Sequence, residues 1–348
     1  MSKIILVIGA TGIQGSSVAS VFLEEPNWIV RGLVRNPTSP EAIELASKGV
    51  ELIKGDLTDL PSLIAAVKGV DLIFANTRFN RAQASESAEF KALARPGQSP
   101  LDFHYEEELS KGSNIADAAA TVEGLERFVW SSASEPGKWS KGKYSDILSF
   151  ESKGAVWKYI QDTHPELARK TSILYLGSYA TNWRWGPAAY NWVKVSICDF
   201  SLVITVTHKW QKNDGSIALR IPGNGPHPIP FVVPSDTGNY VLALTKVPPG
   251  KKLVACSERL TWAAYTELWS RVVGVKAVYE PCSVEEHVRA VPGGYGEMVG
   301  KMYEYATEFG YWGDGDPDVV FPEDLGVEIR HTSIEEFIRS EDWSRVLN

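Results

Sequence analysis

A short apolar run, followed at once by closely spaced glycines, opens the chain. Residues 4–8 read Ile-Ile-Leu-Val-Ile, which is too short for a globular helix and rich in β-branched side chains, so they predict a strand buried on both faces of a parallel sheet. Gly9, Gly12 and Gly15 follow, and a helical pattern runs to about Leu23. Glycines in a strand-to-helix turn let bare backbone N–H groups and the positive helix end approach a pyrophosphate. The stretch therefore predicts a dinucleotide-binding turn.

The second expected strand, residues 28–35, ends in a basic residue. An NAD site places an acid on the ribose 2′-hydroxyl about 20 residues past the glycines. Here that place holds Arg35, and no carboxylate follows until Glu41. A guanidinium can grip a 2′-phosphate and stack on adenine, whereas a carboxylate would repel it. The cofactor is therefore predicted to be NADP(H); the alternative is that Arg35 is a solvated residue at a strand end.

Strands and helices alternate as far as residue 177 and predict a doubly wound parallel sheet, a Rossmann α/β fold. Expected strands cover 50–54, 70–75, 128–132 and 171–177, and expected helices cover 40–48, 60–68 and 106–121. Residues 80–101 read as an irregular insertion. Asp56 follows the third strand, where it either accepts a hydrogen bond from adenine or caps the next helix. Asn76 and Thr77 follow the fourth strand and should face the dinucleotide.

Length and charge restrict the class of protein. A chain of 348 residues is too long for one small core and predicts either two domains or a large domain with an addition. The net charge of −8, with no Lys/Arg run, argues against direct nucleic-acid binding. We expect no signal peptide and no membrane span. Cys198, Cys256 and Cys282 are far apart and predict reduced thiols in a cytoplasmic protein, and the scattered histidines predict no metal site.

Several motifs occur together in a pattern typical of one family. They are the glycine turn at 9–15, Val34-Arg35-Asn36, Gly55-Asp56-Leu57, Phe128-Val129-Trp130-Ser131-Ser132 and Phe150-Glu151-Ser152-Lys153. With them the chain resembles the NmrA-like branch of the atypical short-chain dehydrogenase/reductases, over most of its length and with a C-terminal part typical of fungal members. The resemblance implies an NADP-binding Rossmann domain over 1–177, with late elements returning near 231–256. It also implies a smaller α/β substrate lobe over 178–230 and 257–348.

The turn chemistry and the resemblance together assign the cofactor-binding residues to the carboxyl ends of the strands. These residues are Gly9, Thr11, Gly12, Ile13, Gln14, Gly15, Arg35, Asn36, Asp56, Leu57, Asn76, Thr77, Ser131, Lys153, Leu176, Gly177 and Asn182. The resemblance implies that Lys153 holds the hydroxyls of the nicotinamide ribose; the alternative is a solvated helical lysine. Asp236 is expected to cap the helix over 239–245.

The general acid of the usual short-chain dehydrogenases is missing. Those enzymes carry Tyr-x-x-x-Lys, in which the lysine lowers the pKa of the tyrosine so that the phenol can give a proton to a carbonyl. Counted back from Lys153, the tyrosine position holds Ser149, whose aliphatic hydroxyl is a much poorer proton donor. Tyr144 and Tyr179 are the candidate replacements. The sequence favours neither, and each can instead be a packing residue.

Aromatic residues gather after the sixth expected strand. They include Trp183, Trp185, Tyr190, Trp192 and Trp210. Over a cofactor crevice such rings predict a substrate pocket for a small apolar or aromatic molecule, held by stacking and burial. The alternative is that they pack the core of the smaller lobe. Arg184, in the same segment, can pair with a carboxylate or stack on a tryptophan.

Two functions fit this sequence. The first is an NADP(H)-dependent reductase of a carbonyl, imine or enone in a small metabolite, as in fungal secondary metabolism, with a non-redox NADP-dependent reaction as a variant. The second is a redox-sensing regulator that does no chemistry, acts through a partner protein and works in the cytoplasm or the nucleus. The aromatic segment favours the enzyme and Ser149 favours the regulator. We expect the enzyme.

Overall fold

The computed structural model describes residues 2–79, 88–194, 216–291 and 294–348. Its main feature is an eight-stranded sheet with the order β14-β11-β6-β5-β4-β1-β2-β3, in which every pairing is parallel. Its strands are β1 (Lys3–Ile8), β2 (Trp28–Val34), β3 (Glu51–Lys54), β4 (Leu72–Ala75), β5 (Arg127–Ser132), β6 (Thr171–Leu176), β11 (Lys252–Ala255) and β14 (Val319–Val320). Cys198, Trp210 and part of the expected insertion over 80–101 lie outside the described residues.

Strand β1 lies where the order of the strands reverses. The chain runs from β1 outward to β3, and then starts β4 on the other side of β1. In an open parallel sheet, ligands bind in the crevice that forms outside the carboxyl ends of the strands at such a point. The expected doubly wound sheet is confirmed, and the ends of β1 and β4 mark the place for a site.

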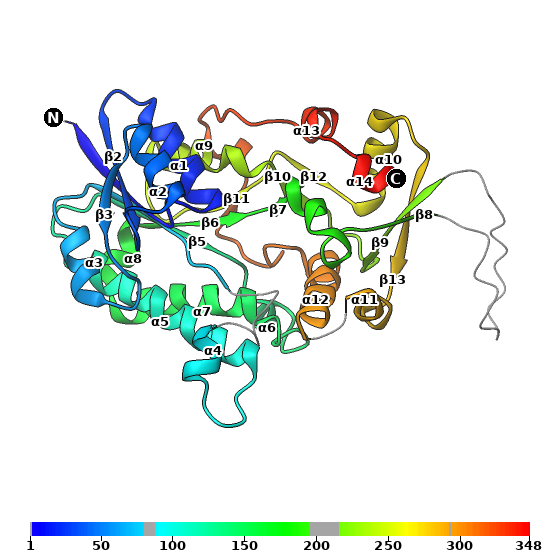
Figure 1. The fold of residues 1–348 in the computed structure, drawn as a ribbon, viewed down its shortest axis with the longest axis horizontal. Helices are drawn as coiled ribbons and strands as arrows, with labels where there is room; N and C mark the ends of the chain where they lie inside the picture. The colour runs from blue at the N-terminus through cyan, green and yellow to red at the C-terminus, as the bar shows by residue number, and fades with distance from the viewer. Residues whose placement is uncertain (1, 80–87, 195–215, 292–293) are drawn as a thin grey trace.

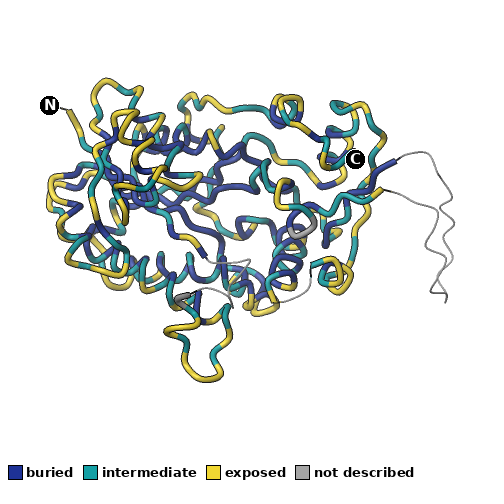
Figure 2. Tube along the Cα trace, in the orientation of Figure 1, coloured by how far each residue is buried: buried dark blue, intermediate teal, exposed yellow. Residues whose placement is uncertain are grey.

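Helices cover both faces of this sheet (Figure 1). One face carries α1 (Ile13–Leu23), α2 (Pro40–Ser47) and α9 (Thr237–Thr245), and the other carries α3 (Leu60–Ala66), α5 (Pro100–Ala120), α7 (Leu148–Thr163) and α8 (Pro165–Lys170). Figure 2 shows the central strands buried between these layers, and every residue of β4 and β6 is buried. Such two-sided burial explains why these strands read as apolar runs without alternation.

Helix α5 begins earlier than the sequence predicts. We expected a helix over 106–121, but it starts at Pro100 because Ser99 caps it: Ser99 Oγ accepts a hydrogen bond from the backbone N of Asp102 at 3.1 Å. Proline suits the first helical position, where its missing N–H has no intrahelical partner to lose. The short α4 (Ala88–Leu93) lies within the expected irregular insertion and packs on α5.

The remaining elements build two small sheets with their own helices, to the right in Figure 1. One sheet joins β7 (Ser178–Tyr179), β10 (Ile229–Val232) and β12 (Glu258–Leu260), and the other joins β8 (Asn191–Lys194), β9 (Ile217–Pro222) and β13 (Ala277–Cys282). The helices of this part are α10 (Trp262–Val273), α11 (Val284–Ala290), α12 (Gly294–Phe309), α13 (Ile334–Ser340) and α14 (Ser344–Leu347). No helix among the described residues is long and apolar enough to cross a membrane.

The chain crosses between the large sheet and this second part more often than expected. β11 and α9 belong to the large sheet, in the range 231–256 predicted to return, but β14 also pairs there although we assigned 257–348 to the smaller lobe. Asp236 does not cap α9 with its side chain. Its Oδ2 instead accepts a hydrogen bond from Thr332 N at 2.7 Å, which ties the start of α9 to the segment before α13. The residue limits of the two lobes stay a prediction.

Candidate functional site

The glycine turn lies at the end of β1, where the strand order reverses. Gly9 has a φ of +83°, which L side chains rarely adopt, and Gly12 N donates to Gly9 O at 2.9 Å. A Cβ at Gly15 would lie 2.2 Å from Gly9 O, so α1 can begin against the strand only because residue 15 lacks a side chain. No side chain caps α1. Its first N–H groups and its positive dipole end are therefore left for an anion or water.

Two buried acceptor atoms beside this turn have no hydrogen-bond partner. They are Asn76 Oδ1, just after β4, and Gln14 Oε1 in the first turn of α1. Asn76 lies directly against the turn, since a Cβ on Gly9 would be 2.1 Å from its Oδ1. A buried acceptor without a donor costs free energy, so such atoms indicate a bound molecule or water that supplies the donor. The hydroxyl and amide groups of a dinucleotide are donors of the right kind, and the residues fit it.

The ends of β2 and β3 form a polar rim beside the turn. Arg35 is exposed directly after β2. The pKa of Asp56 is lowered, chiefly by the backbone N–H of Thr58 and further by the charge of Arg35. Asp56 Oδ1 accepts from the Thr58 N and Oγ1 at 2.8 and 2.7 Å, and Asn36 Oδ1 holds Thr38 in the same way. Asp56 thus shapes the turn that leads into α3, and its contact with adenine stays a prediction.

Lys153 lies in a buried polar cluster that joins three elements. Its Nζ donates to Glu108 Oε1 at 2.6 Å, and to the backbone O and Oγ1 of Thr77 at 3.0 and 3.3 Å. Glu108 comes from α5 and Thr77 follows β4. Thr77 Oγ1 donates to Glu108 Oε1 at 2.6 Å, and Ser152 Oγ donates to Oε2. The Lys153 side chain is only 14% exposed, so it is not the solvated lysine of the alternative interpretation.

Sequence reasoning missed Glu108, although a signal was present. Glu108 lies on the face of α5 that also buries His104, Gly112 and Ile115. These positions repeat at helical spacing and are otherwise small, apolar or aromatic. A carboxylate on such a face is almost never buried without a partner, so it indicates a cation nearby.

The end of β5 is fastened to α7 through the main chain of Lys153. Trp130 Nε1 and Ser132 Oγ both donate to Lys153 O, each at 3.2 Å. Ser131 is buried at the same strand end, and Ser149 is buried on α7. The position at which the usual enzymes carry tyrosine is therefore filled by a serine inside the protein.

The two candidate tyrosines have different surroundings. Tyr144 is buried, and its hydroxyl donates to Glu308 Oε2 at 2.9 Å and to Glu304 Oε2 at 3.4 Å, both on α12. Burial and these carboxylates raise the pKa of Tyr144 well above its usual range, which makes the phenol a weaker acid. The Tyr179 hydroxyl accepts a hydrogen bond from Gln14 Nε2 at 2.7 Å, beside the glycine turn. These surroundings favour Tyr179 over Tyr144 as the candidate proton donor, and the catalytic role of either tyrosine stays a prediction.

Three of the four rings assigned to a substrate pocket belong to a packed core. Trp183 lies with its ring centroid 4.3 Å from that of Trp343, and Trp192 lies 4.4 Å from Trp269. Tyr190 is 1% exposed. Trp183 and Tyr190 belong to the buried cluster of the second part of the molecule, and the partly buried Trp192 packs against it, which supports the packing alternative. The pocket assignment of these three rings stays a prediction.

The other residues of that segment lie nearer the surface. Trp185 is 66% exposed. Arg184 forms a two-point ion pair with Glu341, through Nε and Nη2, so its carboxylate partner is part of the protein. Asn182 Nδ2 makes a long hydrogen bond of 3.5 Å to Ser178 Oγ. Of the predicted pocket rings that the structure describes, Trp185 is exposed and Trp192 is partly buried.

The remaining predicted residues lie at or just beyond the carboxyl ends of β1, β3 and β6. Thr11 and Ile13 are exposed on the glycine turn, and Ile13 is 53% exposed although apolar. Leu57 O accepts from Asn114 Nδ2 at 2.8 Å. Leu176 is buried at the end of β6, and Gly177 N donates to the neighbouring strand.

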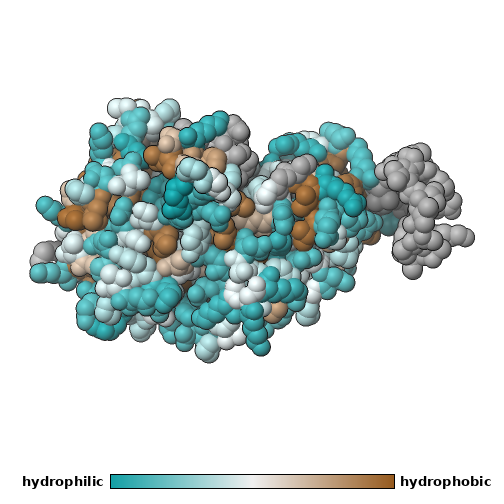
Figure 3. Space-filling view, turned by 90° about the horizontal axis from the view of Figure 1, so that it is seen from below, coloured by the Kyte–Doolittle hydropathy of each residue, from teal (hydrophilic) through white to brown (hydrophobic). Residues whose placement is uncertain are grey.

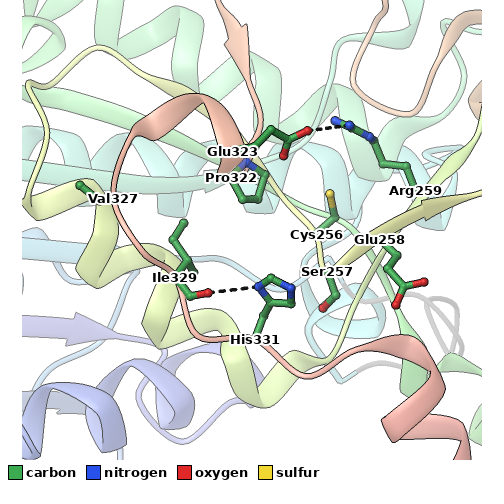
Figure 4. Close-up of a pocket in the computed structure, with 9 residues that line it drawn as sticks. All are labelled: Cys256, Ser257, Glu258, Arg259, Pro322, Glu323, Val327, Ile329 and His331. Carbon is green, nitrogen blue, oxygen red and sulfur yellow. Dashed lines mark hydrogen bonds and ion pairs between the residues drawn. The ribbon is translucent and has the colours of Figure 1, made fainter.

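A cavity of about 320 Å³ lies at the end of β11, and none of the predicted cofactor residues lines it (Figure 4). Its charged groups already have protein partners: Arg259 pairs with Glu323 at 2.7 Å, and Glu258 accepts from Ile334 N at 3.0 Å. His331 Nδ1 lies 3.2 Å from Ile329 O. With its charges satisfied internally, this cavity is no candidate for the cofactor.

Figure 3 shows apolar side chains on one face of the molecule only as separate patches among hydrophilic residues.

The fold and the position of the glycine turn define a protein of the Rossmann-type α/β class. A family description, "NmrA-like family", matches residues 1–338, and the chain belongs to this family. The resemblance seen in the sequence is confirmed.

Relatives and solved structures agree with this assignment. An NmrA-like family domain-containing oxidoreductase of Aspergillus hancockii is 27% identical over 80% of this chain and 75% of its own, and one of Cladobotryum sp is 26% identical over 81% and 76%. The solved structure of NmrA, a negative transcriptional regulator in complex with NADP, is 21% identical with a TM-score of 0.63, covering 97% of this chain and 95% of its own. Isoflavone reductase is 17% identical with the same TM-score, covering 97% and 99%. At these identities the structures show the shared fold.

Proposed function

We propose that this chain binds NADP(H) at the carboxyl ends of β1 and β4 and reduces a carbonyl, imine or enone in a small apolar or aromatic molecule. The observation that carries the proposal is the glycine turn at the reversal of strand order, with the unpaired acceptors of Asn76 and Gln14 beside it. The relatives named above are oxidoreductases, which supports redox chemistry.

The choice of NADP(H) over NAD(H) rests on Arg35. Its guanidinium is exposed at the end of β2, where the ribose 2′-position of a dinucleotide is expected in this fold. Asp56 is close enough for Arg35 to lower its pKa, so a bound 2′-phosphate would share this guanidinium with Asp56. A solved neighbour of the same fold was obtained as an NADP complex.

When bound, NADPH supplies the hydride. In this chain the Lys153 ammonium, held after β4, would bind the ribose hydroxyls, and the Tyr179 hydroxyl would hold the proton for the reduced substrate. Gln14 fixes that hydroxyl by donating to it. Ser149 is buried, and its aliphatic hydroxyl is a poor proton donor, so the proposal gives it no part in the proton step.

Calorimetry with NADPH, NADP+ and NADH, followed by a screen for NADPH oxidation with aromatic ketones and cyclic imines, tests this proposal. We expect NADPH to bind more tightly than NADH and at least one compound to be turned over. If neither NADPH nor NADP+ binds, the cofactor assignment is overturned.

A redox-sensing regulator is the second candidate. Buried Ser149 at the tyrosine position and the raised pKa of Tyr144 favour it, because both weaken the proton supply. One protein of the same fold is described as a negative transcriptional regulator. Tight binding that differs between NADPH and NADP+, without turnover of any compound, would favour this candidate and a partner protein in place of a substrate.

A further inference from the structure

Glu108 is a buried carboxylate whose role the proposed function leaves open. It accepts three hydrogen bonds, from Lys153 Nζ and Thr77 Oγ1 on Oε1 and from Ser152 Oγ on Oε2. Its side chain is 1% exposed. Both oxygens therefore have donors, and the buried charge has its cation at 2.6 Å.

The same contacts fix the direction of the Lys153 side chain. An ammonium has three N–H donors. Here the acceptors are Glu108 Oε1 and the two oxygens of Thr77, which come from different elements. A long flexible side chain held from two sides keeps its head group at one place, beside the end of β4.

Stability alone is a poor reason for such a cluster. Removing two charges from water costs free energy, and replacing a buried ion pair by apolar residues of similar volume is often neutral or stabilising. The two helices that carry the ion pair also pack closely. A Cβ at Gly112, one turn beyond Glu108, would lie only 2.3 Å from Val156 Cγ2 on α7, so this close packing requires a glycine. The glycine lets α5 approach α7 closely enough for Glu108 to reach Lys153.

We propose that Glu108 is a positioning residue that holds the Lys153 ammonium at the carboxyl end of β4, where a ribose hydroxyl of the nicotinamide half of NADP(H) would replace the long contact of that ammonium with Thr77 Oγ1 at 3.3 Å. The proposal rests on the proposed function for the identity of the ligand. The geometry it describes exists without the ligand. Its first test can therefore be made on the free protein.

The first test is chemical labelling of lysines in the free protein, read by peptide mass spectrometry. Lys153 should react slowly in the unchanged protein, because its ammonium protons are engaged and its side chain is 14% exposed. Glu108→Gln keeps the size of the side chain but removes the charge, and it should raise labelling of Lys153 severalfold. Glu107→Gln is the matched control: Glu107 is the neighbouring acid on α5 and pairs with Lys111 at 2.6 Å. It should leave Lys153 protected.

The second test is a double-mutant cycle on NADPH affinity. Glu108→Gln should weaken binding about tenfold, the size expected for losing one hydrogen bond to a charged group. In a Lys153→Met background, Glu108→Gln should have little further effect on NADPH affinity, because a positioning residue acts on the cofactor through the lysine it holds. A merely structural role for Glu108 would give additive losses.

The outcomes separate this proposal from the proposed function. Unchanged labelling of Lys153 in Glu108→Gln would overturn the positioning role, even if NADPH binds and is oxidised. Increased labelling in a protein that binds no NADP(H) would support the positioning role and overturn the cofactor assignment. If Glu108→Gln does not fold, Glu108→Asp, which keeps the charge but shortens the reach, replaces it, with the same expected rise in labelling.

Discussion

One guanidinium at the end of β2 is expected to distinguish two cofactors that differ by a single phosphate. Arg35 is exposed, and the carboxylate that feels its charge, Asp56, is held by Thr58 at the end of the neighbouring strand. A 2′-phosphate carries more negative charge than one carboxylate and offers more acceptor oxygens. We therefore expect residue 35 to have a large share in the choice between the two cofactors.

Arg35→Ala is expected to weaken NADPH binding by about 10- to 100-fold, because it removes a charge-assisted contact to the phosphate. NADH binding should change little, since NADH lacks that phosphate. Isothermal calorimetry with both cofactors measures the effect. Arg31→Ala is the control, because Arg31 lies on the same strand but pairs with Glu51 and the Lys68 carbonyl. An equal loss for both cofactors would contradict the assignment.

Replacing the two tyrosines should have different consequences. With a substrate identified by the screen, Tyr179→Phe should slow reduction under single-turnover conditions by about 100-fold or more, as expected for loss of a general acid. Tyr144→Phe should leave the rate unchanged and lower stability by about 1 kcal/mol, since it removes the hydrogen bonds to α12. An unchanged rate in Tyr179→Phe would exclude that hydroxyl from the proton step.

Residues with a local signature could be read from the sequence, and residues defined by distant partners could not. The glycines at 9, 12 and 15 were predicted, because a strand-to-helix turn has its own chemistry. Glu108 was missed because its meaning depends on Lys153, which lies on another helix. The roles of Trp183 and Trp192 could not be decided from the sequence, because ring density cannot tell a pocket from a core and their partners Trp343 and Trp269 lie far along the chain.

At the scale of elements, the contact between α5 and α7 controls where the polar cluster forms. Both helices pack on the same face of the large sheet, where Val156 is fully buried against α5. Gly112 lies against Val156, and its missing side chain leaves the space that Val156 fills. The spacing of two helices thus depends on one absent methyl group.

Gly112→Ala is expected to lower the free energy of unfolding by about 1–3 kcal/mol, the usual cost of overpacking a core. The added Cβ would lie 2.3 Å from Val156 Cγ2, and a buried β-branched side chain has little room to turn. Denaturant unfolding measures the change. Val156→Ala in the same chain should recover part of the loss, and Gly124→Ala, with no atom within 4 Å of its Cβ, should be near neutral. A neutral Gly112→Ala would show that the helices can separate freely.

The burial of His287, on α11 where it packs on α12, should make the free energy of unfolding depend on pH. His287 is buried, neither ring nitrogen has a hydrogen-bond partner, and burial lowers its pKa from the ordinary value of 6.5. At a pH between the lowered pKa of the folded protein and the ordinary pKa of the unfolded chain, the unfolded chain binds the proton and the folded protein does not. Stability is therefore complete above the unfolded pKa and falls as the pH drops through the window below it.

Thermal unfolding of His287→Leu, compared with the unchanged protein between about pH 7.5 and about pH 5, checks this expectation. The substitution removes the titrating group, so the melting temperature should fall less steeply on acidification. Identical pH slopes for the two proteins would show that His287 accepts a proton in the folded state without cost.

At the scale of the whole molecule, sequence patterns predicted the kind of sheet better than its edges. Runs of buried strands and helices of ordinary length predicted the order of elements as far as β6, and that part of the sheet is confirmed. β14 has only the residues Val319–Val320, too few for a recognisable pattern, and its place depends on pairing with β11. Whether a segment joins the large sheet at this edge depends on a pairing partner far away in the sequence, so a short stretch of sequence does not predict it.

That late completion of the sheet affects how the chain is made. During synthesis β1 to β6 leave the ribosome first, and β6 then waits at an open edge until Lys252–Ala255 can pair with it. A strand at an open edge exposes unpaired N–H and C=O groups that can pair with another chain and cause aggregation. The N-terminal half of the sheet therefore keeps an aggregation-prone edge until residues made much later in the chain pair with it.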